Sequence, residues 1–395
     1  MKVMGPEVET FQPIRKSIAP PRRAQCAIII DIKETNEMTG KERIMRQIAG
    51  EEVDRIPLVG GWNLGLGNVA ALAELSIPEY LSDPLGGVIK ANLDLGVDAV
   101  ATLVVPLEPA EIRTGSIEEH NFSEVEPEAL LNRAMTIPDD EAGVLAQFDA
   151  VATEQEFRQN FQALIERLRN ENLEFLPNFW KVIANFSLYS EYGYEAFLAA
   201  VALYPEAVEK IYWESGILRR EQNKIVLKLM EEWSLLPIIF CGHDMCDQRG
   251  PLVSPDWLRE HYWPHAKKSV APLLEAGIRL VHHCDGNVMP LIDDMLECGF
   301  TGFQGFQYEC GVDPAIIREK ALKYHDTPLF LGGLSVTKTL LAGTPEAIRS
   351  EVDYCFDFTA GGRGLLLFTS NCTVVETPVE NIRLAYSYAT THGIG

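Results

Sequence analysis

The residues best suited to chemistry lie together in the stretch 280–287, which reads Leu-Val-His-His-Cys-Asp-Gly-Asn. Imidazole nitrogen, thiolate sulfur and carboxylate oxygen are all ligands that Zn²⁺ and similar divalent metals accept. On a strand, side chains two residues apart share a face. The stretch therefore offers two alternative ligand pairs, His282 with Cys284 or His283 with Asp285. Either pair is an incomplete site that needs a further ligand from another part of the chain.

An ordinary structural interpretation of the same residues has to be weighed against metal binding. A single histidine at a strand end is more often a hydrogen-bonded core residue than a ligand. The residues Asp285, Gly286 and Asn287 are also common turn formers, since glycine and asparagine tolerate positive φ. The choice depends on whether the fold brings other ligands to this stretch.

Short apolar strands alternate with helices along most of the chain, which is typical of a parallel sheet that is buried on both faces. Eight such units over 395 residues predict a TIM (β/α)8 barrel. The expected strands are residues 54–60, 96–105, 175–179, 236–241, 279–283, 302–306, 328–332 and 364–368.

Two regions depart from this alternation. Residues 1–37 carry little pattern and are expected to form an N-terminal arm, whereas residues 38–395 form a single barrel. Residues 107–150 are acidic and contain short alternating pieces at 111–117 and 131–137. We expect an inserted hairpin with loops there, followed by a helix over residues 154–170.

In a TIM barrel the chemistry takes place at the carboxyl ends of the strands. Four expected strand ends carry polar or ligand-type residues, and they should converge on one mouth. Cys372 follows the last strand and is expected to supply the missing metal ligand. Asp244 and His243 are weaker candidates for a fourth ligand or an acid/base group. The four ends are residues 241–247, 282–287, 304–309 and 370–372.

Composition excludes several classes of function. The formal net charge is −23, so the surface repels phosphate backbones and anionic membranes, and neither nucleic acid nor membrane is an expected partner. The eight cysteines are scattered without the density of a disulfide scaffold, which fits a reducing cytoplasm. No apolar run reaches the roughly 20 residues of a spanning helix.

Several motifs, in order from residue 38 to the C-terminus, resemble landmarks of the uroporphyrinogen decarboxylase superfamily. The resemblance implies a TIM barrel, in agreement with the strand count. The motifs are residues 38–43 (Met-Thr-Gly-Lys-Glu-Arg), 52–57 (Glu-Val-Asp-Arg-Ile-Pro), 250–255 (Gly-Pro-Leu-Val-Ser-Pro), the His-x-Cys/Asp-Gly-Asn stretch, 332–333 (Gly-Gly), 343–346 (Gly-Thr-Pro-Glu) and 377–381 (Thr-Pro-Val-Glu-Asn).

The superfamily has two branches, and the sequence favours one of them. Uroporphyrinogen decarboxylases carry an arginine-rich loop just after the first strand, but residues 60–67 contain no arginine here. The other branch, the zinc- and corrinoid-dependent methyltransferases, has a His-x-Cys-Gly-Asn pattern and a later cysteine. A gap-free match uses His283 and Asp285, and a match with one extra residue uses His282 and Cys284. Cys372 matches the later cysteine in both cases.

The resemblance implies that zinc at the barrel mouth activates a small substrate, while the methyl group moves to or from cobalt. No Asp-x-His-x-x-Gly corrinoid-binding signature is present, so the corrinoid should arrive on a partner protein. Asp244 or Glu309 would stabilise a leaving oxygen, and Asn287 and Gln304 are expected to contact the cofactor. The chain is a possible homodimer.

Aromatic residues near the expected strand ends favour an aromatic methyl ether as substrate, with a thiol that accepts a methyl group as the alternative. A metal-independent lyase that uses His283 and Asp285 as base and acid remains another interpretation, as does a barrel without catalysis that binds a partner. The aromatic residues are Trp62, Phe179, Trp180, Phe186, Tyr189, Phe303, Phe306 and Tyr308.

Overall fold

The computed structural model describes residues 38–108 and 125–391. The expected arm and the expected strand at 111–117 lie outside these ranges. Eight strands are described, each parallel to its neighbours. All their residues are buried except Glu174, which is half-buried. They are β1 (Val59–Gly60), β2 (Ala99–Val100), β3 (Glu174–Phe175), β4 (Ile238–Gly242), β5 (Arg279–His283), β6 (Gly302–Gln304), β7 (Leu329–Leu331) and β8 (Leu365–Leu366).

The eight strands follow one another in sequence order around a TIM barrel, as predicted. One sheet has the order β1-β2-β3 and the other the order β4-β5-β6-β7-β8. Isolated parallel bridges join the two sheets on both sides, between Leu58 and Leu367 and between Asn178 and Phe240. Short strands and bridges of this kind leave the carboxyl ends of all eight strands at one mouth.

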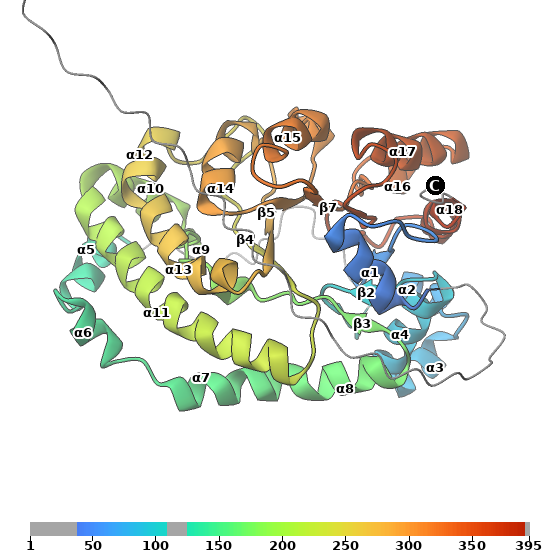
Figure 1. Cartoon of the computed structure of the whole chain (residues 1–395), viewed down its shortest axis with the longest axis horizontal. Coiled ribbons are helices and arrows are strands. Elements are labelled where there is room, and N and C mark those ends of the chain that lie inside the picture. The colour runs from blue at the N-terminus through green and yellow to red at the C-terminus, as the bar shows by residue number, and fades with distance from the viewer. Residues whose placement is uncertain (1–37, 109–124, 392–395) are drawn as a thin grey trace, which may run out of the picture. The chain divides into compact units, whose positions relative to one another are not determined.

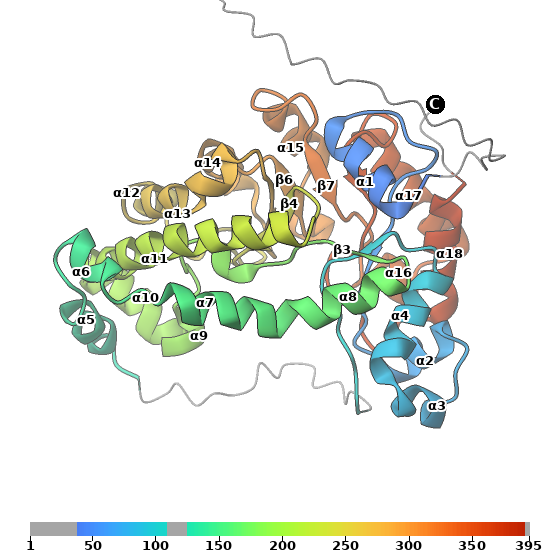
Figure 2. The ribbon, with the colours of Figure 1, turned by 60° about the horizontal axis from the view of Figure 1, so that its bottom comes forward.

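Helices surround the strands. Figures 1 and 2 show the long α11 beside α13, with α7 running along it and α8 continuing past its end. They are α1 (Gly40–Ala49), α2 (Leu66–Leu72), α3 (Ile77–Ser82), α4 (Pro84–Asp94), α5 (Glu128–Met135), α6 (Glu141–Leu145), α7 (Ala150–Phe157), the π-helix η2 (Arg158–Gln162), α8 (Ala163–Asn170), η3 (Trp180–Val182), α9 (Tyr189–Tyr192), α10 (Tyr194–Leu203), α11 (Pro205–Glu232), α12 (Pro255–His261), α13 (Trp263–Glu275), η4 (Met289–Leu291), α14 (Ile292–Cys298), η5 (Tyr308–Cys310), α15 (Pro314–Ala321), α16 (Thr339–Ala342), α17 (Pro345–Phe358) and α18 (Val379–Ala389).

The expected hairpin strand at 131–137 is wrong, because that segment contributes to helix α5. Leu130 and Ala134 are buried and lie four residues apart, which is a helical period rather than the alternation of a strand. The apparent alternation came from polar residues on the exposed side, namely Asn132 and Thr136. The helix expected at 154–170 is present as α7, η2 and α8.

The core has two layers, one inside the barrel and one between the strands and the helices. Successive side chains of each strand point alternately into the two layers. Val281 and Phe240 belong to the cluster inside the barrel. Leu280 and Ile239 belong to the cluster between the strands and the surrounding helices. Since side chains alternate along a strand, this pattern fixes which residues of β5 point into the barrel.

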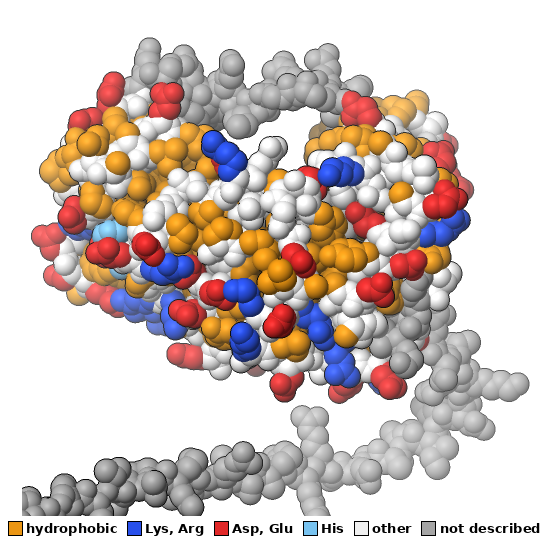
Figure 3. All heavy atoms as spheres, turned by 90° about the horizontal axis from the view of Figure 1, so that it is seen from above, with side chains coloured by type: hydrophobic (Ala, Val, Ile, Leu, Met, Phe, Trp, Pro, Cys, Tyr) orange, Lys and Arg blue, Asp and Glu red, His pale blue; other side chains and the backbone are white. Residues whose placement is uncertain are grey.

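The surface carries both signs of charge despite the acidic composition. Figure 3 shows acidic, basic and apolar side chains interspersed on one face. Within the part of the chain that the structure describes, no helix has both the length and the apolar character needed to cross a membrane.

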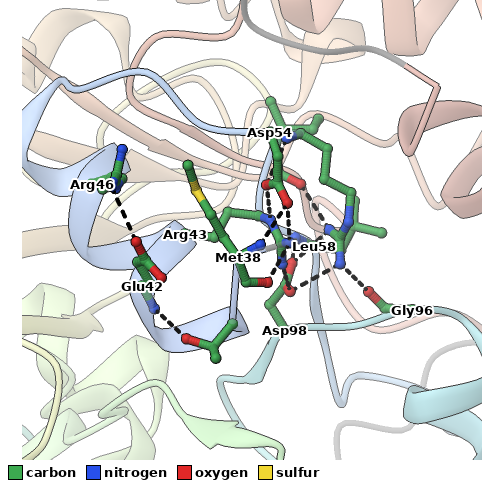
Figure 4. A network of polar contacts seen from close by, with 11 residues as sticks. Met38, Glu42, Arg43, Arg46, Asp54, Leu58, Gly96 and Asp98 are labelled. Atoms are coloured by element: carbon green, nitrogen blue, oxygen red, sulfur yellow. Dashed lines mark hydrogen bonds and ion pairs between the residues drawn. The ribbon is translucent and has the colours of Figure 1, made fainter. Parts of the chain in front are cut away.

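A buried ionic network ties α1 to the first two strands (Figure 4). Arg43 and Arg55 both bind the carboxylate of Asp98, and Arg43 also binds Asp54 at 2.6 Å. Asp98 in turn accepts a hydrogen bond of 2.9 Å from the backbone N–H of Leu58. The network therefore holds the strand segments around β1 and β2 at their amino ends, away from the mouth.

Candidate metal centre

The register of β4 and β5 brings their carboxyl ends side by side. Gly242 pairs with His283, so Asp244 and Asp285, two residues further along each chain, lie next to each other. Gly242 has a φ of 145°, and a Cβ there would lie 2.2 Å from the carbonyl oxygen of His283. A glycine is thus needed for the close approach of the two strands at this point.

His283 points into the barrel, and His282 points away from it. The ring of His283 meets those of Trp62 and Phe240 with centroid distances of 5.8 and 6.0 Å. His282 instead packs edge-on against Phe300, at a centroid distance of 4.8 Å, in the outer layer of the core. The alternation along β5 therefore separates the two candidate ligand pairs onto opposite faces.

Asp244, His283 and Asp285 form the one cluster of potential metal ligands found among the described residues. Their ligand atoms all lie within 4.8 Å of one another. Nε2 of His283 is 3.4 Å from Oδ1 of Asp244 and 3.8 Å from Oδ1 of Asp285. The backbone N–H of Asp285 also donates to Oδ1 of Asp244 over 2.9 Å. One imidazole and two carboxylates are therefore directed at a common point.

Gln304 determines which nitrogen of His283 faces this point. Its amide Nε2 donates to the carbonyl oxygens of Thr369 and Ser370 over 2.9 and 3.0 Å. Its Oε1 must then be the atom that contacts Nδ1 of His283. An amide oxygen accepts only, so Nδ1 carries the proton and Nε2 of the neutral ring carries the lone pair. Metal-binding histidines are oriented by partners of this kind.

Asn371 holds the second carboxylate in a similar way. Its Nδ2 donates to Oδ2 of Asp285 over 2.7 Å, and its Oδ1 accepts the backbone N–H of Cys372 over 2.6 Å. Oδ1 of Asp285 is buried without a hydrogen-bond partner among the described residues. No role for Asn371 was predicted from the sequence, although its place beside Cys372 after the last strand was a signal.

The electrostatics of the cluster favour a bound cation. Burial raises the pKa of Asp285, His283 lowers it, and the carboxylate of Asp244 raises it further. Two carboxylates that share a site repel each other, and a divalent cation between them removes that repulsion. Nitrogen and oxygen donors suit Zn²⁺ and also harder metals such as Mn²⁺. The donor set at this point thus fits a divalent metal.

Cys284 and His282 are not brought to this cluster. Both are buried on the outer face of β5, where Sγ of Cys284 accepts the backbone N–H of Met245 over 3.3 Å. Burial raises the pKa of the Cys284 thiol, and burial lowers the pKa of His282. A buried neutral thiol is a poor ligand compared with a thiolate.

Cys372 lies beside the cluster without belonging to it. It is half-buried and packs against the apolar residues inside the barrel. Burial, with the negative charge of Asp285 adding to it, raises the pKa of its thiol to about 11. Its backbone is fixed by Asn371, the residue that also holds Asp285.

The other expected site residues have different surroundings. Glu309, on η5, is exposed and accepts a hydrogen bond from Thr337, and its charge adds to the raised pKa of Asp285. Asn287 is engaged in a turn, where its backbone N–H donates to Asp247 over 2.8 Å and its Oδ1 accepts from Met289 over 3.3 Å.

Of the expected aromatic residues, Trp62 and Tyr189 adjoin the cluster, since Trp62 contacts His283 and Tyr189 donates to the backbone carbonyl of Asp244 over 2.8 Å. The side chain of Trp180 lies outside the part of the chain that the structure describes. The others are packed in the outer layer of the core or against it, namely Phe179, Phe186, Phe303, Phe306 and Tyr308.

Comparisons with known proteins agree with this architecture. A sequence model of the family described as uroporphyrinogen decarboxylase (URO-D) matches residues 243–392, which include β5 to β8 and every residue of the cluster. A methyltransferase from Methanosarcina mazei has a similar structure, with a TM-score of 0.58 over 89% of this chain and 98% of that chain, at 19% sequence identity.

A curated relative is also similar in sequence over part of its length. It is the methylcobamide:CoM methyltransferase MtaA of Methanosarcina barkeri, with 25% identity over 149 residues. The match covers 37% of this chain and 41% of the relative. The match to the uroporphyrinogen decarboxylase family model thus covers residues 243–392, and the two proteins that the chain resembles are both named as methyltransferases.

Proposed function

We propose that this protein is a metal-dependent methyltransferase that moves a methyl group between a small substrate and the cobalt of a corrinoid on a separate protein. The observation that carries the proposal is the arrangement of His283, Asp285 and Asp244 at the barrel mouth. The similarity to a methyltransferase named for a cobamide substrate supports the corrinoid partner.

The residues of the chain have separable tasks in this reaction. Nε2 of His283 and the carboxylates of Asp285 and Asp244 would hold the metal, which supplies Lewis acidity when bound. Gln304 keeps the proton on Nδ1 of His283, and Asn371 keeps one oxygen of Asp285 engaged so that the other faces the centre. Open coordination is left for a substrate atom, as a catalytic site requires.

The favoured substrate is a small methyl ether, and an aromatic one suits the tyrosines beside Asp244. Removal of a methyl group from an ether leaves an alkoxide or phenoxide that needs stabilisation. Glu309 is exposed at the mouth, and its charge acts on Asp285. Its carboxyl group is therefore suited to exchange a proton with the leaving oxygen of the ether. Asp244 would then act as a metal ligand and not as the group that stabilises the leaving oxygen. Its side chain is 47% exposed.

A methyl acceptor with a thiol group is the second candidate, because the relative MtaA is named for a transfer to CoM. In that case the same centre would bind the substrate sulfur and lower the pKa of the thiol, as metals do. The residues that hold the metal are the same in both cases. We favour the ether because of the aromatic side chains at the mouth.

The compartment belongs to the same proposal. The seven described cysteines form no disulfide with one another, and we propose a cytoplasmic location for the enzyme.

Methyl transfer to a reduced corrinoid protein tests the function. The purified enzyme is loaded with Zn²⁺ or Mn²⁺ and incubated either with methyl ethers and a reduced corrinoid protein or with thiols and a methylated corrinoid protein. Methylation of cobalt in the first case and of sulfur in the second is followed by absorbance and mass spectrometry. We expect transfer with at least one substrate, loss of transfer after chelation, and recovery when metal is added back. Transfer that survives complete removal of metal would contradict the metal-dependent mechanism.

A further inference from the structure

Two stacked tyrosines stand next to the candidate metal centre. The rings of Tyr189 and Tyr194 are nearly parallel, with an angle of 8° and a centroid distance of 4.4 Å. Tyr189 is anchored, since its hydroxyl donates to the backbone carbonyl of Asp244 over 2.8 Å and accepts from Ser187 over 3.2 Å. Tyr194 lies on top of it and remains 44% exposed.

This pair is close to the carboxylates of the centre. The negative charge of Asp244 adds to the effect of burial in raising the pKa of both tyrosines. Since Tyr189 also packs edge-on against Phe186 and Phe197, its ring has a fixed position beneath Tyr194. The stack is a rigid aromatic wall with an accessible outer ring.

The charges around the mouth are unbalanced. Asp244 and Asp285 pair with His283 alone among the described residues, and no described lysine or arginine forms an ion pair with either of them or with Glu309. A divalent cation would neutralise the two aspartates and leave the negative charges of Glu309 and Asp247 against the positive charge of Lys338, all of which act on Cys310 at the mouth. The mouth would then be neutral to negative with metal bound, which disfavours an anionic substrate.

We propose that Tyr194, supported by Tyr189, forms the wall on which an aromatic methyl donor stacks, and that the site selects neutral or cationic donors over anionic ones. Aromatic rings stack in offset or edge-to-face arrangements, and a tyrosine face also attracts a cation. The inference rests on the proposed function, because it assigns the substrate class of the same centre. Tyr194 contributes to substrate selection rather than to the transfer itself.

Three probes that share one ring and one methoxy group separate the effect of charge from that of shape. They are 4-methoxybenzylammonium, 4-methoxybenzyl alcohol and 4-methoxybenzoate. Binding of each to the full chain loaded with Zn²⁺ is measured by calorimetry without a corrinoid protein. Because this assay measures binding alone, it can be carried out even if the enzyme transfers no methyl group. We expect the cation and the alcohol to bind at least about 10-fold more tightly than the carboxylate.

Substitutions at Tyr194 test the wall itself. Tyr194→Ala should weaken binding of the cation and the alcohol by about 3- to 10-fold, in line with typical aromatic contacts. Tyr194→Phe should preserve it, because the ring remains. The matched control is Tyr324→Ala, since Tyr324 is similarly exposed at 48% but lies near the C-terminal end of α15. Equal binding of all three probes, tighter binding of the carboxylate, no binding of any probe, or no effect of Tyr194→Ala would overturn the proposal.

Discussion

At the scale of single residues, the centre depends on which atoms two amides present to their neighbours. Gln304 has both amide hydrogens engaged by the carbonyls of Thr369 and Ser370, so its oxygen has to face His283. Asn371 has its oxygen engaged by a backbone N–H, so its amide hydrogens face Asp285. These two side chains orient His283 and Asp285, the proposed metal ligands, toward the same point.

Replacement of Gln304 by leucine should weaken metal binding. Without the amide oxygen, the ring of His283 is free to rotate and to change its tautomer. Loss of such a partner typically costs about 10- to 100-fold in metal affinity. Competition with a fluorescent chelator measures this, with Gln162→Leu as a control, since Gln162 is a half-buried residue of η2 whose amide donates to Glu166. An unchanged affinity in Gln304→Leu would show that the amide does not orient the ligand.

The candidate site was only partly predictable from sequence at this scale. The sequence showed that residues 282–285 include metal-ligand types. It also showed that alternate residues of a strand offer two possible ligand pairs on opposite faces. The choice itself depends on the register of β5 against β4, which residue types alone do not determine. The sequence pattern drew attention to Cys284 and Cys372, whereas the structure groups Asp244 with His283 and Asp285.

At the scale of elements, the close approach of β4 and β5 positions the ligands. The eight strands were predictable because each is a short apolar run followed by a helix. The helix at residues 131–135 was not predictable, because a short amphipathic segment fits both the helical and the strand period. Its packing against α10 and α11 decides between the two. Loops between strands and helices then place the polar residues at the mouth.

A methyl group at Gly242 should disturb both stability and metal binding. The residue has a positive φ, and a Cβ would meet the backbone of His283 at 2.2 Å. We expect Gly242→Ala to lower the free energy of unfolding by about 2 kcal/mol or more and to weaken metal affinity. Urea denaturation measures the first effect. Gly67→Ala is the control, because a Cβ at Gly67 in α2 meets nothing within 4 Å, and a loss of stability as large in this control would refute the argument.

The loop after β7 contains a pH-sensitive contact. Glu351 on α17 accepts hydrogen bonds from the backbone of Ser335 over 3.1 Å and from Thr339 over 3.0 Å. Burial nonetheless raises its pKa to about 7, and the charge of Glu309 contributes. The folded protein therefore holds this proton more tightly than the unfolded chain, so stability falls as pH rises from about 4.5 to about 7.

Glu351→Gln should remove this part of the pH dependence. The amide stays uncharged, so we expect the variant to be more stable than the wild type at pH 8 by up to about 3 kcal/mol, and similar to it at pH 5. Thermal unfolding at a series of pH values measures the difference. The assignment would be contradicted if the variant and the wild type lost the same stability between pH 5 and pH 8.

At the scale of the whole molecule, the two ends of the barrel serve different purposes. The amino ends of the first strands are held by the buried network of Arg43, Arg55, Asp54 and Asp98 (Figure 4), and the carboxyl ends of the strands carry the proposed metal ligands. The net charge of −23 predicts that nucleic acid is not a partner. It did not reveal that, among the described residues, no arginine or lysine forms an ion pair with Asp244, Asp285 or Glu309.

Removal of the central carboxylate in the network should affect stability and leave metal binding in the folded protein unchanged. Asp98→Ala leaves two arginines without their shared partner in a buried place, which typically costs about 3–5 kcal/mol. Guanidinium denaturation measures this loss. Metal affinity measured well below the melting temperature should match that of the wild type, and a parallel loss of metal affinity would show that the two ends are not independent.

The most direct test of the account is calorimetric titration of the metal-free enzyme with Zn²⁺ and Mn²⁺, in the wild type and in two variants of adjacent residues. We expect about one site per chain in the wild type, loss of that site in His283→Ala, and an intact site in His282→Leu, because His282 faces the outer layer of the core. No stoichiometric binding in the wild type, or equal loss in both variants, would contradict the metal centre described above.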